Sequence, residues 1–273
     1  MPFDGRGTGR RAVFSGPDAL RQASLELESL SLRFQVDYDR IKVADIGNAL
    51  GMRFEKVFSD VKETIYRILE LKAKPVMLGG EHTLTWAAID EIRPSHLVLF
   101  DAHLDLRDEY LGERVSHTTF LRRICEEHPD LRVLHIGLRG VSREEVKYAK
   151  ERKIKIIPST TFTKEPIVET LSTQIKGAES IYISVDLDVI DPAYMEEVGN
   201  PEPEGPSPTE LFDLFAAFSG NRVIGFDVME LSPTCRWSPS HHLAAKTVFE
   251  LMAATSKDDD IRIKGDFLPQ RGD

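Results

Sequence analysis

Three short segments of the chain combine carboxylates and imidazoles at spacings that suit metal binding. They read Gly79-Gly80-Glu81-His82, Asp101-Ala102-His103-Leu104-Asp105 and Asp186-Leu187-Asp188. Alternate side chains of an extended segment share a face, so Asp101, His103 and Asp105 can turn toward one point. Asp186 and Asp188 can do the same. Because these donors are oxygen and nitrogen without thiolate, they favour manganese, although iron, cobalt, nickel or zinc fit the same set.

The three segments supply more ligands than one small cation needs. The candidates are four carboxylates and two imidazoles: His82, Asp101, His103, Asp105, Asp186 and Asp188. Two ions that share bridging carboxylates account for the surplus. A pair of divalent ions lowers the pKa of bound water toward neutrality, so the set predicts a hydrolase.

Each segment taken alone has other interpretations. The DAHLD segment could be a polar loop, and the glycine pair before Glu81 could only make a tight turn. The DLDVID segment resembles the aspartyl nucleophile motif of haloacid-dehalogenase-type phosphatases, but that reading leaves the other two segments without a role. Binuclear phosphoesterases need Gly-Asn-His and Gly-His-x-His motifs that are absent here. The alternative of another class is a non-catalytic, metal-stabilised binding protein.

All three segments follow short apolar runs, which predict buried strands. The predicted strands are Pro75 to Leu78, His96 to Phe100, Arg132 to Ile136, Ile154 to Ile157, Ile181 to Val185 and Arg222 to Val228. Helical spacing lies between them, in Phe54 to Leu71, Thr83 to Ile92, Thr118 to Glu127, Arg143 to Glu151, Pro208 to Phe218 and His242 to Ala254. This alternation predicts a parallel sheet with helices on both faces, which binds ligands at the carboxyl ends of its strands.

Two further elements and one loop are predicted. Asp18 to Leu32 is a possible helix, and Val36 to Ile46 a possible edge strand. The proline-rich stretch Asn200 to Pro208 is better interpreted as an ordered active-site loop than as a linker, because the same helix and strand signals continue on both sides.

Composition is that of a packed enzyme. The chain has 273 residues, 41% hydrophobic and 29% charged, and we expect residues 1–273 to form one domain. The formal net charge of −10 argues against nucleic-acid binding and suits a cationic substrate. Cys125 and Cys235 are too few for a disulfide framework. With neither an apolar run after the first basic residues nor a stretch of ~20 apolar residues, we expect a cytoplasmic protein without a membrane span.

Five motifs in order resemble the ureohydrolase family, which includes arginase and agmatinase. They are GGEHTLTW, DAHLDLRD, SHTTFLRR, SVDLDVIDPAY and FDVMELSP. The resemblance implies a three-layer α/β/α fold with a mainly parallel eight-stranded sheet, two Mn²⁺ ions, release of urea from a guanidino substrate, and homo-oligomers such as trimers or hexamers.

The resemblance also implies individual roles. It places His82 and Asp105 on one metal and His103 and Asp188 on the other, with Asp101 and Asp186 as bridges. His117 matches a histidine that shuttles protons near the leaving amine, and Glu230 matches an acidic residue that grips the guanidinium.

The motifs depart from the family pattern at three points, and the loop before His117 bears on the substrate. Glu81 replaces a usual aspartate, Thr118 a frequent glycine, and Asn200 the threonine of a frequent Gly-Thr-Pro. The stretch from Leu106 to Ser116 lacks the asparagine with which arginases bind arginine's tail, which favours agmatine. Asp108, Glu109 and Glu113 could attract its second cation. Arginine, guanidinobutyrate and formiminoglutamate remain alternatives.

Overall fold

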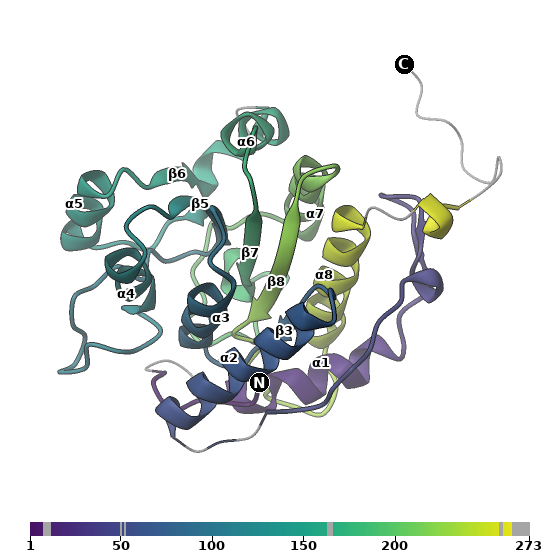
Figure 1. Cartoon of the computed structure of the whole chain (residues 1–273), viewed down its shortest axis with the longest axis horizontal. Helices are drawn as coiled ribbons and strands as arrows, with labels where there is room; N and C mark the ends of the chain where they lie inside the picture. Colours follow the sequence, from purple (N-terminus) through teal and green to yellow (C-terminus); the bar gives the residue numbers. More distant parts are fainter. Residues whose placement is uncertain (8–11, 50, 52, 163–165, 257–258, 264–273) are drawn as a thin grey trace.

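A six-stranded, wholly parallel sheet forms the centre of the computed structural model (Figure 1). The structure describes residues 1–7, 12–49, 51, 53–162, 166–256 and 259–263. The strands of the sheet are β3 (Val76–Leu78), β4 (His96–Phe100), β5 (Arg132–Leu138), β6 (Lys155–Pro158), β7 (Ile181–Asp186) and β8 (Val223–Met229). Their order across the sheet is β3-β8-β7-β4-β5-β6, so the carboxyl ends of β3, β8, β7 and β4 are neighbours.

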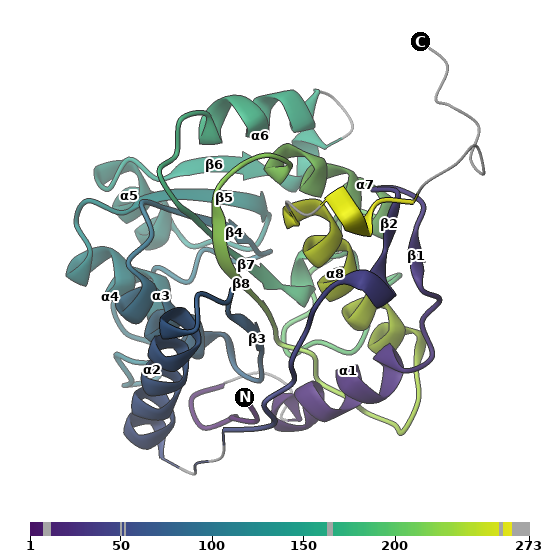
Figure 2. The ribbon, with the colours of Figure 1, turned by 45° about the vertical axis from the view of Figure 1, so that its right-hand side comes forward.

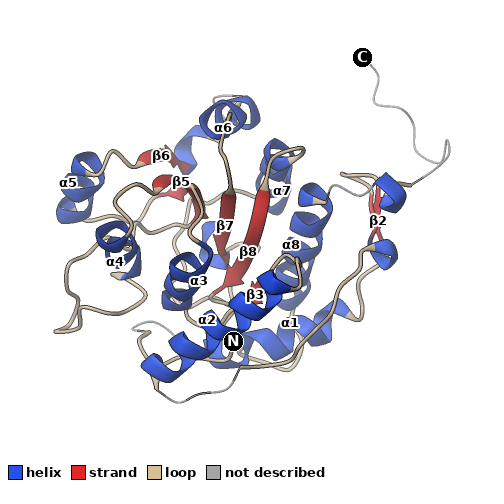
Figure 3. Cartoon of the chain, viewed as in Figure 1, coloured by secondary structure: helices blue, strands red, loops and turns tan. Residues whose placement is uncertain are grey.

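Helices cover both faces of the sheet and make three layers, as Figures 2 and 3 show. One layer contains α2 (Phe54–Glu70), α3 (Thr85–Ile92), α4 (Phe120–Glu127) and α5 (Arg143–Glu151). The other contains α1 (Gly16–Ser24), α6 (Ile167–Ile175), α7 (Pro208–Leu214) and α8 (Pro239–Thr255). The expected three-layer α/β/α fold is therefore confirmed.

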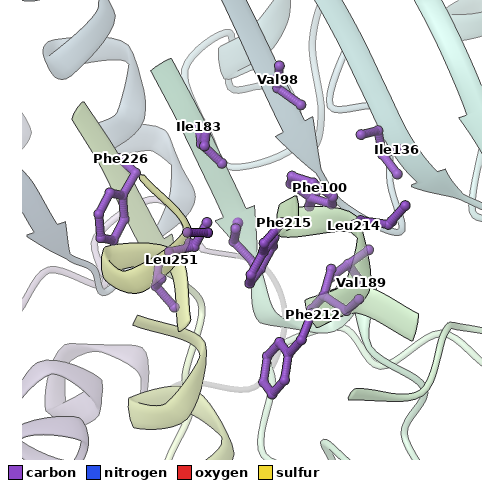
Figure 4. Close-up of a cluster of buried hydrophobic side chains, with 14 of the residues drawn as sticks. Val98, Phe100, Ile136, Ile183, Val189, Phe212, Leu214, Phe215, Phe226 and Leu251 are labelled. Atoms are coloured by element: carbon purple, nitrogen blue, oxygen red, sulfur yellow. The ribbon is translucent and has the colours of Figure 1, made fainter. Parts of the chain in front are cut away.

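Each face of the sheet has its own hydrophobic core, because every central strand is apolar on both sides. On the α7 and α8 side, Phe100 packs edge-on against Phe215, with ring centroids 5.7 Å apart, in the same buried cluster as Ile183 and Phe226 (Figure 4). On the other side Leu97, Leu99 and Tyr182 face α2, α3 and α4. Burial on two sides fixes the positions of the strand ends, where the polar segments begin.

The expected eight-stranded sheet is wrong for the described residues. Two further strands, β1 (Leu30–Ser31) and β2 (Val36–Asp37), form a separate antiparallel two-stranded sheet, and Val36 of β2 also makes a bridge with Arg262. Fully buried Val36 packs in a small separate core with Tyr38 and Ala253 of α8. These residues are thus used to cover α8 and do not extend the main sheet.

Several boundaries differ from the predictions for local reasons. The N-terminal helix ends at Ser24, and the chain beyond it turns into the β1–β2 hairpin. The helix α6 was not predicted, and its sequence IVETLSTQI is rich in β-branched residues that are weak helix formers.

In the part of the chain that the structure describes, no helix combines the length and apolarity that a membrane crossing requires.

Candidate metal centre

The six predicted ligands all lie at the carboxyl ends of neighbouring strands. His82 opens the 3-10 helix His82–Leu84 that follows β3. Asp101, His103 and Asp105 follow β4, and Asp186 ends β7. Asp188 lies in the 3-10 turn Leu187–Val189, whose first backbone amides are capped by the Asp186 carboxylate, with Asp188 N 2.9 Å from Oδ1. The sheet order thus brings together three segments far apart in the sequence.

A first group of donors consists of His82, Asp101 and Asp186, all buried. The Nδ1 atom of His82 lies 3.0 Å from Asp186 Oδ2 and 3.3 Å from Asp101 Oδ2. Within the described part of the chain, neither His82 Nδ1 nor Asp101 Oδ2 has a hydrogen-bond partner. An imidazole nitrogen and a carboxylate oxygen can both donate an electron pair to a cation, so two such atoms buried face to face without hydrogen-bond partners are what a cation site leaves when protein atoms alone are counted.

A second group shares Asp101 and adds His103 and Asp188. The Nδ1 atom of His103 lies 3.0 Å from Asp188 Oδ2 and 3.8 Å from Asp101 Oδ1. The two oxygens of Asp101 therefore face different groups. This is the arrangement expected of a carboxylate that bridges two ions.

Asp105 belongs to neither group of mutually close donors, but it lines the same cavity as Asp186 and Asp188. It is buried, and its φ of 52° lies in the left-handed region that side chains other than glycine seldom adopt. Strain of this kind persists where the surrounding structure imposes it, often at functional sites. Burial together with this conformation separates Asp105 from the exposed acids of the chain.

The charge balance of the buried donors fits a pair of divalent cations. Burial raises the pKa of Asp186 well above its usual value, and the charges of Asp188 and Asp101 add to this effect. Burial also raises the pKa of Asp105, with a contribution from Asp101. Burial opposes protonation of His82, but Asp101 and Asp186 outweigh it and raise the pKa of the imidazole. Without a cation, the negative charges of Asp105 and Asp186 are removed only when these carboxylates bind protons. Divalent ions would replace those protons and neutralise the carboxylates.

A buried hydrogen-bond chain behind His82 fixes the orientation of its ring. The Nε2 atom lies 2.8 Å from Ser184 Oγ, which donates to Asp227 Oδ1 at 2.5 Å. Since the Ser184 proton goes to Asp227, Nε2 must donate to Ser184, and Nδ1 is then the ring atom that faces Asp101 and Asp186 and that would bind a cation in place of a proton. Tyr182 and Thr85 complete the network by donating to Asp227 Oδ2, each at 2.9 Å.

Asp227→Asn is expected to weaken metal binding without changing a direct donor. The amide cannot accept three hydroxyl donors as the carboxylate does, so Ser184 and the His82 ring lose their fixed orientation. Substitutions behind a metal ligand cost about 10- to 100-fold in metal affinity. Titration of the metal-free variant with Mn²⁺ measures the effect, and an affinity equal to that of the wild type would remove Asp227 from this role.

A cavity of about 520 Å³ opens above the candidate ligands. It is lined by both predicted catalytic residues, His117 and Glu230. Burial, with the nearby charges of His103 and His82, lowers the pKa of His117 to about 4, so its ring is neutral near pH 7. Glu230 follows β8 with a φ of 66° and accepts the His82 backbone N–H at 2.7 Å. This hydrogen bond links the segments that follow β3 and β8, and it holds the Glu230 carboxylate at the wall of the cavity.

The acids suggested for the outer end of the cavity lie elsewhere. Asp108 Oδ1 is 2.7 Å from Arg123, and Glu113 is 2.8 Å from Arg6. The polar side chains that line the outer cavity include Arg107, Tyr110, Glu145, Asn200 and Glu202. Arg107 also stacks on Tyr110, 5.1 Å from the ring centroid.

Sequence reasoning missed the residues that support the ligands. Asp227 is the residue of this kind that is easiest to predict from sequence, because a carboxylate inside the apolar run VIGFDVM must have buried hydrogen-bond partners. Ser184 lies two residues before Asp186 and so on the same face of β7. His135 of β5 is also buried, and its Nε2 donates to the carbonyl of His103 at 2.6 Å.

Comparison with known proteins gives consistent matches over almost the whole chain. The model of the arginase family matches residues 1–254. An agmatinase of Pyrococcus horikoshii is 34% identical over 94% of this chain and 90% of its own length. The N(1)-aminopropylagmatine ureohydrolase of Thermococcus kodakarensis is 32% identical, with 94% of this chain and 89% of its own covered. The crystal structure of the agmatine ureohydrolase of Thermoplasma volcanium superposes with a TM-score of 0.85 at 33% identity, covering 93% of this chain and 87% of that one.

Proposed function

The chain belongs to the arginase family, and from this premise we propose that it is a binuclear metal-dependent ureohydrolase that converts agmatine to putrescine and urea. The observation that carries the proposal is the pair of donor groups joined by Asp101, at the base of a cavity that also holds His117 and Glu230. We propose one catalytic domain over residues 1–273. Manganese, a cytoplasmic location and a homo-oligomeric assembly belong to the same proposal.

The proposed metal ligands are the six residues of the sequence prediction. Asp101 and Asp186 would be the bridging carboxylates, and the position of Asp101 supports this role because its oxygens face both groups. His82 and Asp105 would hold one ion, and His103 and Asp188 the other. Asp186 lies in the group of His82, and Asp105 lines the cavity beside it. When bound, the two ions act as Lewis acids that make bound water nucleophilic near neutral pH.

The residues of the chain would orient the substrate. A guanidinium ion is planar and carries parallel N–H groups, so the carboxylate of Glu230 can accept two of them at once. Because Glu230 is buried and lies beside Asp186 and the His82 amide, this contact holds the guanidino carbon over the ligands. The guanidinium would in turn balance a carboxylate whose pKa burial raises well above its usual value.

His117 would move the proton that the leaving amine needs. A neutral imidazole accepts a proton at one nitrogen and can release it to a neighbouring amine. The Nδ1 atom of His117 lies 3.4 Å from Asn200 Nδ2, which orients the ring over the cavity. Protonation makes the amine a better leaving group, so this transfer would assist cleavage of the C–N bond.

His117→Ala is expected to reduce turnover about 100- to 10,000-fold while the metal content stays that of the wild type, because His117 transfers protons and is not a ligand. Steady-state urea release and elemental analysis on the same sample measure both quantities. Turnover like that of the wild type would exclude His117 from proton transfer.

The substrate is tested by urea release from a panel of guanidino compounds. With Mn²⁺ bound, we expect agmatine to have the highest kcat/KM, ahead of arginine and of N(1)-aminopropylagmatine. A higher value for arginine would contradict the assignment. Loss of activity toward every compound, with metal bound, would favour a binding protein.

A second candidate substrate class is a guanidino acid, such as 4-guanidinobutyrate. The observation in its favour is Arg107, a guanidinium in the lining of the outer cavity that would attract a carboxylate tail. Glu145 and Glu202 line the same region and favour a cationic tail, and Glu145 lies 3.9 Å from Arg107. The ratio of kcat/KM for agmatine and 4-guanidinobutyrate decides between the two.

A further inference from the structure

Arg139, which directly follows β5, lies between two loops beside the cavity, the turn of residues 187–190 and the loop of residues 199–205. Among the described residues, its guanidinium donates only to backbone carbonyls of these loops and of its own strand. Nη2 donates to Asp188 O and Glu202 O, both at 2.7 Å, and Nη1 donates to Val189 O at 2.9 Å and Gly137 O at 3.1 Å. Nε donates to Pro203 O at 2.9 Å. One side chain thus joins the segment that holds Asp188 to the segment that follows Asn200.

The backbone of the same residue lies on the DAHLD segment. The amides of Arg139 and Gly140 both donate to Ala102 O, at 3.0 and 2.8 Å. Gly140 forms a bridge with His103, and a Cβ at Gly140 would lie 2.7 Å from His103 Cδ2. Arg139 is therefore tied through its backbone to the segment that carries His103 and through its side chain to the turn that carries Asp188, and both of these candidate ligands belong to the second group.

The loop that the guanidinium holds lines the substrate side of the cavity. Asn200 lies 3.4 Å from His117, and Glu202 Oε2 is 3.8 Å from His103 Nε2. Gly205 closes this loop against Arg139, since a Cβ there would lie 2.7 Å from Nη2 and 2.6 Å from Asp191 N. The loop thus packs directly on the guanidinium.

We infer that Arg139 is a positioning residue, which holds the loop of residues 199–205 and the Asp188 turn in the geometry that the metals and the substrate need. The guanidinium of arginine is planar and has five N–H donors in fixed directions, so it can donate to several carbonyls at once. A lysine ammonium has three donors at a single point and reaches fewer of them. The inference rests on the proposed function only where activity is the readout.

The test compares Arg139→Lys with Arg143→Lys, a matched change at an exposed residue that begins α5. In Arg139→Lys we expect amide hydrogen exchange to rise at least about tenfold within residues 188–206 and to stay unchanged in α2. We expect Mn²⁺ affinity to fall about 10- to 100-fold. At saturating metal, KM should rise about tenfold or more with a smaller change in kcat. Arg143→Lys should match the wild type in every measurement.

A second variant disturbs the same contact from the other side. Gly205→Ala places a methyl group against the guanidinium and should raise amide hydrogen exchange in the same residues.

If Arg139→Lys has the amide hydrogen exchange and the KM of the wild type, the inference is overturned. It is also overturned by exchange that rises across the whole chain with KM unchanged, which is the signature of a general loss of stability. If the wild type releases no urea from any guanidino compound, the proposed function fails, while exchange and metal titration still decide the role of Arg139.

Discussion

Asp186→Asn is expected to remove metal binding and activity together. Asparagine has the shape of aspartate and keeps an oxygen for the Asp188 backbone amide, so the turn after β7 should persist. It lacks the negative charge that faces His82, and its amide nitrogen cannot coordinate a cation. Lewis-acid activation contributes several kcal/mol to hydrolysis, so urea release should fall at least about a thousandfold.

The matched control for this change is Asp213→Asn, an exposed aspartate of α7 that pairs with Arg33. Elemental analysis and urea release on the same preparations give both readouts. The control should bind metal and turn over substrate like the wild type. An Asp186→Asn protein that keeps two ions per chain would show that this carboxylate is not a ligand.

Glu230→Gln is expected to lower kcat/KM strongly while metal binding is kept. Glutamine can still accept the His82 amide through its oxygen, so the metal loops should keep their geometry. Its side-chain nitrogen, however, would face the N–H groups of the guanidinium, and the charge that pairs with the substrate is lost. Breaking a buried hydrogen-bonded charge pair costs about 2–5 kcal/mol, which corresponds to about 30- to 5,000-fold in kcat/KM.

Metal content distinguishes this variant from Asp186→Asn. We expect Glu230→Gln to bind as much Mn²⁺ as the wild type, and the exposed Glu169→Gln on α6 to retain full activity. A loss of metal in Glu230→Gln would assign the residue to the metal site, and unchanged kcat/KM would exclude it from guanidinium binding.

The positions of the six central strands could be predicted from sequence because each is a short apolar run that stops at a polar segment. Burial on both faces disfavours polar side chains within the run, so a polar segment marks the end of the strand, and two isolated exceptions, Ser184 and Asp227, are hydrogen-bonded to each other. That rule alone is enough to place His82, Asp101 and Asp186 at one edge of the sheet. It could not give the sheet order, which depends on contacts between distant parts of the chain.

Short and irregular elements escaped the same reasoning. The strands β1 and β2 have two residues each, too few to show alternation. Arg139 carried no sequence signal, because its partners are backbone carbonyls and any residue supplies those. Asp227 did carry one, as a carboxylate within an apolar run, and similar residues can be sought in other chains.

The central claim is that two cations share Asp101 between the His82 and His103 groups. Anomalous diffraction from crystals grown with Mn²⁺, recorded at the manganese absorption edge, tests it directly. The account predicts two peaks per chain, about 3.5–4 Å apart, one beside His82 and Asp186 and one beside His103 and Asp188. A single peak, or peaks remote from Asp101, would contradict it.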